Sequence, residues 1–187
     1  MNISLSLITA ICSCLIIYFI FFGNINFKTL EFKCFYERFD HENPHNELQS
    51  KLDNLLNLDL SSEQIYLLAS DLMSNQHYEE ASKVFSLFIS KFPNLLDSDI
   101  YARYAESLYL KNNKTFNENI ILAINNALFL DPSNYKALTL NGLNLYGKQN
   151  FKQALNNWAI ALDNVESEDE KKALIIVMNA AIKQLEQ

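Results

Sequence analysis

Few residues in this sequence have the types and spacing that perform chemistry, and a histidine pair is the clearest case. Residues 41–45 read H-E-N-P-H, which matches the H-E-x-x-H zinc-hydrolase pattern letter for letter. That pattern works because one continuous helix places both histidines on the same face, at positions i and i+4. Pro44 interrupts a helix between the two histidines, and no third ligand follows along the chain. A solvated linker is therefore the favoured interpretation, and a zinc hydrolase is the rejected alternative.

The cysteines, the last histidine and the acidic residues do not suggest a reaction centre either. Cys12, Cys14 and Cys34 form no C-x-x-C pair, which excludes a disulfide framework, a thioredoxin-type redox site and an attached c-type haem. Modification or redox use of Cys34 stays an open alternative. An acidic run such as residues 166–170, at a helix start, is usually solvated and favoured by the helix dipole. His77 has no Ser/Asp or Cys pattern around it, so we predict no catalytic, cofactor or metal residues and no enzyme.

Composition restricts the function further. The 187 residues include 15 Lys and Arg against 22 Asp and Glu, which gives a formal net charge of −7. A nucleic-acid-binding protein needs a basic surface to contact phosphates, so that class is excluded. Only 3 Gly and 3 Pro are present, whereas sheets joined by tight turns need more of these residues. The composition therefore predicts an all-α chain with one modest folded unit and an appendage.

The N-terminal segment, residues 1–27, predicts a membrane anchor. It contains no charged side chain, and the apolar run of residues 3–22 would be about 30 Å long as a helix, the thickness of a hydrocarbon core. A cleaved signal peptide is the alternative, but the basic start and the small-residue cleavage site are missing. Lys28, Lys33 and Arg38 follow the run, and this positive-inside bias favours a cytoplasmic location for the rest of the chain.

The rest of the chain is predicted to be helical and repetitive. Residues 28–60 form a juxtamembrane linker and a connecting helix, and residues 61–187 form a repeat domain. Within that domain the order helix, turn, helix occurs three times, at about residues 62–95, 98–134 and 135–166. This order resembles the tetratricopeptide repeat, a helix–turn–helix unit in which small side chains let paired helices approach. The predicted fold class is all-α, with an N-terminal transmembrane helix followed by a tetratricopeptide-repeat solenoid of about three repeats. An irregular helical bundle is the alternative.

Residue spacing supports the repeat and locates an insertion. The interval from Pro132 to Glu166 equals the period of the tetratricopeptide repeat, which is about 34 residues. The interval from Pro93 to Pro132 exceeds this period by about 5 residues, so the middle repeat contains an insertion. We place most of the insertion in the turn at residues 111–115.

Local patterns mark the two ends of the repeat domain. Residues 61–64 and 167–170 are both capping boxes, and the second predicts a C-terminal capping helix over residues 168–186. Two departures weaken the match to the repeat. Asn141 replaces an expected large apolar residue, and Ile120 replaces an expected alanine.

The first helix of each repeat lines the concave groove of such a solenoid, so the residue types there predict the ligand. An aromatic and apolar face with Tyr and Met suits an amphipathic helix of a partner protein. The groove lacks the converging Lys, Arg and Asn that would hold an acidic chaperone tail. For each groove residue the alternative is packing against neighbouring helices. The predicted groove residues are Tyr66, Ser70 and Met73 in the first repeat, Ala102, Glu106 and Tyr109 in the second, and Thr139, Leu143 and Tyr146 in the third.

The order of features also resembles one particular group of repeat proteins. Residues 127–138 read A-L-F-L-D-P-S-N-Y-K-A-L, and residues 150–158 read N-F-K-Q-A-L-N-N-W. These segments resemble the periplasmic repeat domain of the CcmI/NrfG family, whose members assist bacterial cytochrome c maturation. Trp158 is the most specific element of the resemblance. The resemblance covers residues 44–187 and, less specifically, the anchor.

This resemblance implies a non-catalytic subunit of a haem-lyase complex. It implies a single span in the bacterial inner membrane, in contact with lipid, and a repeat domain in the periplasm, a location that disagrees with the positive-inside bias. It further implies that the groove captures the C-terminal helix of apocytochrome c and presents it to the haem-lyase membrane subunits, with no cofactor of its own. Two alternatives stay open. One is a scaffold for another envelope or organelle membrane complex that uses the convex face, and the other is a cytoplasm-facing receptor for targeting sequences.

Overall fold

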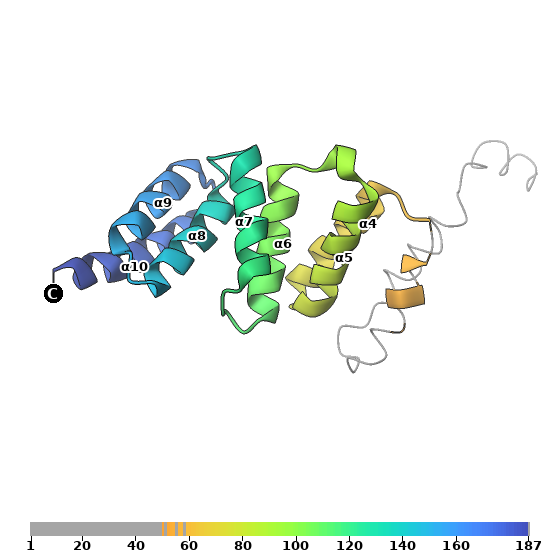
Figure 1. Cartoon of the computed structure of the whole chain (residues 1–187), viewed down its shortest axis with the longest axis horizontal. Coiled ribbons are helices and arrows are strands. Elements are labelled where there is room, and N and C mark those ends of the chain that lie inside the picture. The colour runs from red at the N-terminus through yellow and green to blue at the C-terminus, as the bar shows by residue number, and fades with distance from the viewer. Residues whose placement is uncertain (1–49, 51, 55, 58, 187) are drawn as a thin grey trace, which may run out of the picture. The chain divides into compact units, whose positions relative to one another are not determined.

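The computed structural model describes residue 50 and residues 52–54, 56, 57 and 59–186, and the regular structure in these residues is helical. The helices pack in antiparallel pairs (Figure 1), which confirms the predicted all-α class. Residues 65–187 form one compact unit. The elements within residues 59–186 are α4 (Ser62–Ser74), α5 (Tyr78–Lys91), the 3-10 helix η1 (Pro93–Leu95), α6 (Ser98–Lys111), α7 (Glu118–Leu130), α8 (Tyr135–Gly147), α9 (Phe151–Asn164) and α10 (Glu168–Leu185).

Several sequence predictions fall outside the described residues. They are the membrane anchor at residues 1–27, the histidine pair at residues 41–45 and the linker through residue 49. Within the described part of the chain, no helix combines the length and the apolar character that a bilayer span requires. The same part contains no group of three or more His, Cys, Asp or Glu side chains placed to hold a metal ion. The anchor and its orientation therefore stay predictions.

Side chains at the helix starts satisfy backbone amides that have no partner within the helix. In each of four helices the capping side chain accepts a hydrogen bond from the amide three residues later. These caps explain why the helices begin where they do. The capping residues are Asp97 of α6, Asn117 of α7, Asn134 of α8 and Ser167 of α10.

The two predicted capping boxes differ in the structure. The box at residues 61–64 is complete, because Ser61 and Gln64 each accept a hydrogen bond from the other's backbone amide. At the start of α10, the Ser167 hydroxyl accepts from the Glu170 amide at 3.4 Å. The Glu170 carboxylate does not complete this box, because it contacts side chains of α8 instead. The second box is therefore only half formed.

Residues other than glycine make the turns inside the helix pairs. Three residues join α4 to α5 and three join α8 to α9, and each of these turns contains one glutamine in the left-handed conformation. The φ angles are 63° for Gln76 and 61° for Gln149. This explains how a chain with only 3 glycines can form such short connections.

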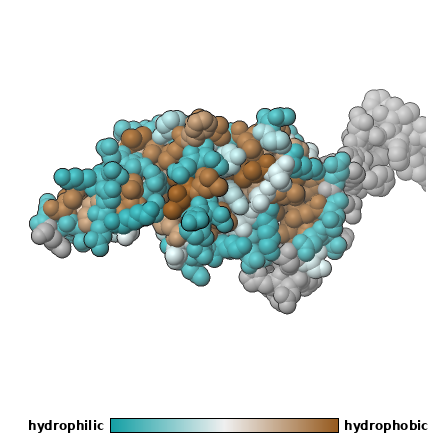
Figure 2. Space-filling model, viewed as in Figure 1, coloured by the Kyte–Doolittle hydropathy of each residue, from teal (hydrophilic) through white to brown (hydrophobic). Residues whose placement is uncertain are grey.

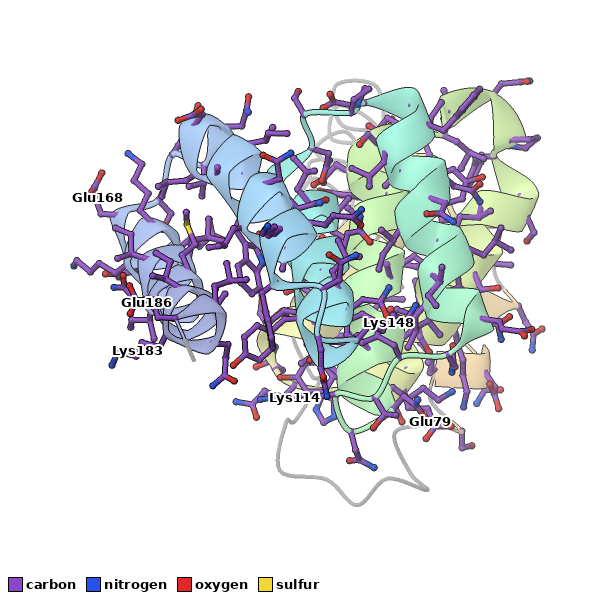
Figure 3. All side chains as sticks on the ribbon, turned by 60° about the vertical axis from the view of Figure 1, so that its left-hand side comes forward. Glu79, Lys114, Lys148, Glu168, Lys183 and Glu186 are labelled. Atoms are coloured by element: carbon purple, nitrogen blue, oxygen red, sulfur yellow. The ribbon has the colours of Figure 1, made fainter. Side chains whose placement is uncertain are left out.

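The turn between α6 and α7 is the longest of the three turns inside the helix pairs, and it overlaps the predicted insertion at residues 111–115. It spans residues 112–117 and is twice as long as each of the other two intra-pair turns. Asn113 and Lys114 are left-handed here, with φ angles of 51° and 59°. Figure 3 shows Lys114 and Lys148 at the same end of the helix pairs, where these turns lie. The connection between α5 and α6, at residues 92–97, contains η1 and is longer than the one between α7 and α8, at residues 131–134.

The indole ring of Trp158 packs between α8 and α9. This side chain is 0% exposed, and its Nε1–H donates to the carbonyl oxygen of Thr139 at 3.1 Å. Gly142 lies one turn further along α8, and a Cβ added there would overlap the indole ring. Asn141, which departs from the repeat pattern, donates from Nδ2 to the side-chain oxygen of Asn157 on α9 at 3.0 Å. The helix pair α8 and α9 is thus joined by an apolar contact that needs glycine at position 142 and by a hydrogen bond between two side-chain amides.

We expect Gly142→Ala to lower the free energy of unfolding by about 1–3 kcal/mol, because the new methyl group displaces a rigid buried ring. This loss occurs even though alanine is the better helix former by about 1 kcal/mol. Gly147→Ala on the same helix is the matched control, since no described atom lies within 4 Å of its added Cβ and neither glycine has a positive φ. Urea unfolding of the full-length chain in mild detergent, followed by circular dichroism, measures both. Equal losses in the two variants would contradict the role of the indole contact.

Candidate functional site

A cavity of about 290 Å³ lies between α6, α8 and α10. Most of its walls are leucine, valine, alanine and tyrosine side chains, so the interior is largely apolar. Three charged residues also line it: Glu106 on α6, Lys136 on α8 and Glu170 on α10. The cavity is therefore an apolar space with a small number of placed charges, which is the usual composition of a binding site.

The lining residues of α10 follow the same spacing as those of α8. Three lining residues of α8 each have a counterpart in α10 that lies one repeat period later in the sequence and also lines the cavity. Thus α10 contributes to the site in the way that the first helix of a further repeat would. The pairs are Lys136 and Glu170, Thr139 and Ala173, and Leu143 and Val177.

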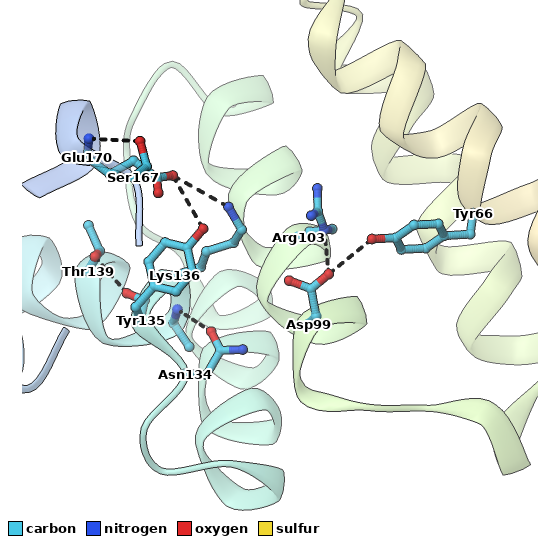
Figure 4. A network of polar contacts seen from close by, with 10 residues as sticks. Tyr66, Asp99, Arg103, Asn134, Tyr135, Lys136, Thr139, Ser167 and Glu170 are labelled. Atoms are coloured by element: carbon cyan, nitrogen blue, oxygen red, sulfur yellow. Dashed lines mark hydrogen bonds and ion pairs between the residues drawn. The ribbon is translucent and has the colours of Figure 1, made fainter. Parts of the chain in front are cut away.

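A polar contact between α8 and α10 lies in the lining of the cavity. The Lys136 ammonium lies 3.7 Å from Oε1 of Glu170, and the Tyr135 hydroxyl donates to the same oxygen at 3.4 Å (Figure 4). Burial alone would lower the pKa of Lys136, but the Tyr135 hydroxyl and the negative charges of Glu106 and Glu170 outweigh it and raise that pKa. Lys136 is therefore charged at neutral pH and already engaged by Glu170.

A second polar cluster joins α4 to α6. The Tyr66 hydroxyl donates to Oδ2 of Asp99 at 3.1 Å, and Arg103 pairs with the same carboxylate (Figure 4). The Arg103 guanidinium also lies 5.7 Å from the centre of the Tyr66 ring, a cation–π distance. Tyr66, Asp99 and Arg103 thus satisfy one another within the protein.

Glu106 differs from the other acidic residues near the cavity. It is half-buried, and among the described residues no hydrogen bond or ion pair involves its carboxylate. Burial raises the pKa of Glu106, Lys136 and Arg103 lower it, Glu170 and Asp99 raise it, and the net result is a raised pKa. The cavity therefore contains a carboxylate that has charged neighbours but no direct partner.

The cavity contains four of the nine groove residues predicted from the sequence: Glu106, Tyr109, Thr139 and Leu143. The three predicted residues of α4 are half-buried and do not line this cavity. These α4 residues are Tyr66, Ser70 and Met73. Whether any of the nine predicted residues contacts a ligand stays a prediction.

Two further predicted groove residues, Ala102 and Tyr146, do not line this cavity. Ala102 is 0% exposed and packs with Ala127 and Ala137, because its methyl group is too short to reach past this close approach of helices. The Tyr146 ring packs within its own helix pair, 5.2 Å from the ring of Phe151 and 6.0 Å from that of Trp158. Tyr146 therefore has packing partners within its own helix pair, and whether it also contacts a ligand stays a prediction.

The residues that α10 contributes were not predicted from the sequence. Glu170, Ala173 and Val177 lie in the segment interpreted as a capping helix, and a cap is not expected to line a groove. The signal that identifies them is the repeat period, which continues past Glu166 into α10.

Comparison with known protein families and with curated proteins found no match. Among solved structures, the chain is similar to one described as "putative YfrE protein from Vibrio parahaemolyticus". The similarity has 25% sequence identity and a TM-score of 0.38, and it covers 46% of this chain and 96% of that one. A likeness this distant says nothing about function.

We expect Glu106→Gln to stabilise the protein near neutral pH by an amount on the order of 1 kcal/mol. Because the pKa of Glu106 is raised in the folded state, folding favours its protonated form. That contribution to stability is present below the ordinary value of 4.5 and is lost as the pH rises through the folded pKa. The uncharged glutamine removes this cost, so its advantage should shrink as the pH falls towards 4.5.

Urea unfolding of the wild type and of Glu106→Gln, at neutral pH and at pH 4.5, measures this effect. Glu166→Gln, at an exposed position before α10, is the matched control and should change little at either pH. A destabilised Glu106→Gln variant at neutral pH would mean that the carboxylate has a stabilising partner.

Proposed function

We propose that the helix pairs are three tetratricopeptide repeats, at about residues 62–95, 98–134 and 135–166, with a capping helix over residues 168–186. Three features support this assignment. Two of the pairs share a three-residue turn with a left-handed glutamine. A glycine packs under a large aromatic ring in the α8/α9 pair, and the register of the repeat continues from α8 into α10.

We infer that the cavity binds side chains of a partner protein, and that the chain is non-catalytic. The observation that carries this inference is the apolar cavity itself, lined by α6, α8 and α10 with few charges. Its volume of about 290 Å³ is at the lower end of ligand pockets. A cavity of this size has room for the anchor side chains of a helix that lies across α6, α8 and α10. Recognition of an amphipathic helix by a groove uses such anchors.

We further propose that the bound helix is the C-terminal helix of an apocytochrome c. The support is the sequence resemblance to the CcmI/NrfG family, which has its most specific element at Trp158. In this proposal the chain is anchored in the bacterial inner membrane by residues 1–27, and the repeats lie in the periplasm. The repeats hold the client for the haem-lyase subunits. A reporter fused after Gln187 tests this topology, because a periplasmic reporter excludes the cytoplasm-facing receptor.

Ala173→Phe should block the cavity and weaken peptide binding at least about tenfold, or about 1.4 kcal/mol. Ala173 is exposed and lines the cavity, so a phenyl ring there fills the space without removing a core contact. Ala180→Phe is the matched control, because Ala180 is exposed on the same helix and is not among the lining residues. The probe is a synthetic peptide of the C-terminal helix of a c-type apocytochrome from the same cell. Calorimetric titration uses the full-length chain in mild detergent.

Micromolar or tighter binding is expected for the wild type and for Ala180→Phe, and no binding is expected for folded holocytochrome. If the wild type does not bind the peptide, capture of apocytochrome by this chain is wrong. If Ala173→Phe binds as tightly as the wild type, the peptide binds outside the cavity.

A scaffold function is the second candidate, and the exposed face of α7 favours it. Leu122, Phe129 and Leu130 are 59%, 86% and 48% exposed. Hydrophobic side chains reach the surface in several places on the face drawn in Figure 2. Exposed large apolar side chains that gather on one helix are typical of a protein-binding face.

A scaffold that uses α7 predicts a different mutant pattern. Phe129→Asp should then disrupt the membrane complex, which native electrophoresis of detergent-solubilised membranes measures as a loss of the high-mass species. Ala173→Phe should leave that complex intact. The opposite pattern would favour the cavity as the functional site.

A further inference from the structure

The charges around the cavity are unequally satisfied. Lys136, Glu170 and Tyr135 contact one another, and Arg103 pairs with Asp99. The Glu106 carboxylate lines the cavity without a hydrogen bond or an ion pair to any described residue. A half-buried carboxylate gains more from a direct charged partner than an exposed one, because its surroundings screen charge less.

The walls beside this carboxylate are apolar. Leu143 and Thr139 of α8 and Val177 and Leu174 of α10 line the same cavity as Glu106. An aliphatic stem that ends in a cation matches this arrangement, because the stem contacts the apolar walls while the cation reaches the carboxylate. Lysine and arginine are the side chains with that construction. An acidic side chain is disfavoured, since the one cation among the lining residues, Lys136, already pairs with Glu170.

We propose that Glu106 is the anchor point for a lysine or arginine side chain of the segment that the cavity captures. The proposal rests on the proposed function insofar as that side chain belongs to the captured helix. The net charge of −7 acts in the same direction, since it attracts basic segments and accelerates their association.

The first experiment tests the cavity with the side chain alone. The probe is n-butylammonium, which is a lysine side chain without its backbone, and 1-butanol is the uncharged control. Both are titrated into the isotope-labelled full-length chain in mild detergent, and the amide signals of Ala173 and Leu174 report occupancy. The wild type should bind n-butylammonium at least about fivefold more tightly than 1-butanol. The Glu106→Gln variant should lose this preference, and Glu166→Gln should keep it.

A second readout in the same samples distinguishes direct pairing from a structural role of Glu106. The carboxyl carbon signal of Glu106 gives its pKa, and a bound cation should lower that pKa in the wild type. The uncharged 1-butanol should not lower it. Equal affinities for the two probes, or a preference that survives in Glu106→Gln, would overturn the proposal.

The second experiment uses the apocytochrome peptide and separates this proposal from the proposed function. Each lysine and each arginine of the peptide is replaced in turn by norleucine, which keeps an aliphatic stem and removes the charge. One replacement should weaken binding to the wild type about tenfold and have little effect on binding to Glu106→Gln. If the peptide binds and no replacement matters, the basic anchor is wrong and capture of the helix stands. If the peptide does not bind while n-butylammonium is preferred, the anchor stands and the client is a different protein.

Discussion

The contact between the indole of Trp158 and the bare backbone at Gly142 determines how α8 lies in this protein. The ring occupies the volume that a side chain would fill, and its N–H holds the carbonyl oxygen of Thr139. Lys136, Thr139 and Leu143 are on the same stretch of α8 and line the cavity. The position of one cavity wall therefore depends on a packing contact on α9, outside the cavity. Interiors are close-packed, so a displaced ring transmits its shift to the neighbouring helix.

The polar contacts leave one carboxylate of the cavity, that of Glu106, without a direct partner. The Tyr66, Asp99 and Arg103 cluster and the Tyr135, Lys136 and Glu170 cluster each neutralise their charges internally. They join α4 to α6 and α8 to α10, so their main role is to set the positions of helices. Glu106 lies between the two clusters in the sequence and belongs to neither of them. If the cavity binds side chains as proposed, this single carboxylate would discriminate between ligands by charge, and the apolar walls would discriminate by shape.

The helices and turns were predictable from the sequence because their signals are local. Capping side chains such as Asn134 and the half-box at Ser167 act within three residues of the helix start. The lining of the cavity was less predictable, because counting positions gives the direction of a side chain and not its reach. Ala102 is too short to pass its neighbours, whereas the ring of Tyr146 is long enough to pack against Trp158. The lining residues of α10 were not predicted, because the sequence pattern of a terminal helix predicts a cap. Only the packing shows that this helix borders the cavity.

Helix α10 is the last described helix and also forms a wall of the cavity, and this affects any affinity measured there. Among the described helices α10 packs chiefly against α9, and its buried residues are only Leu174 and Ala181. Helices held by few buried contacts undock and redock more readily than interior ones. In the proposed function, a ligand would meet the complete cavity only in molecules with α10 docked, so the apparent dissociation constant would be the intrinsic one divided by the docked fraction. Substitutions on α10 that never touch the proposed ligand would therefore change the affinity for it, through the fraction of molecules that are ready to bind.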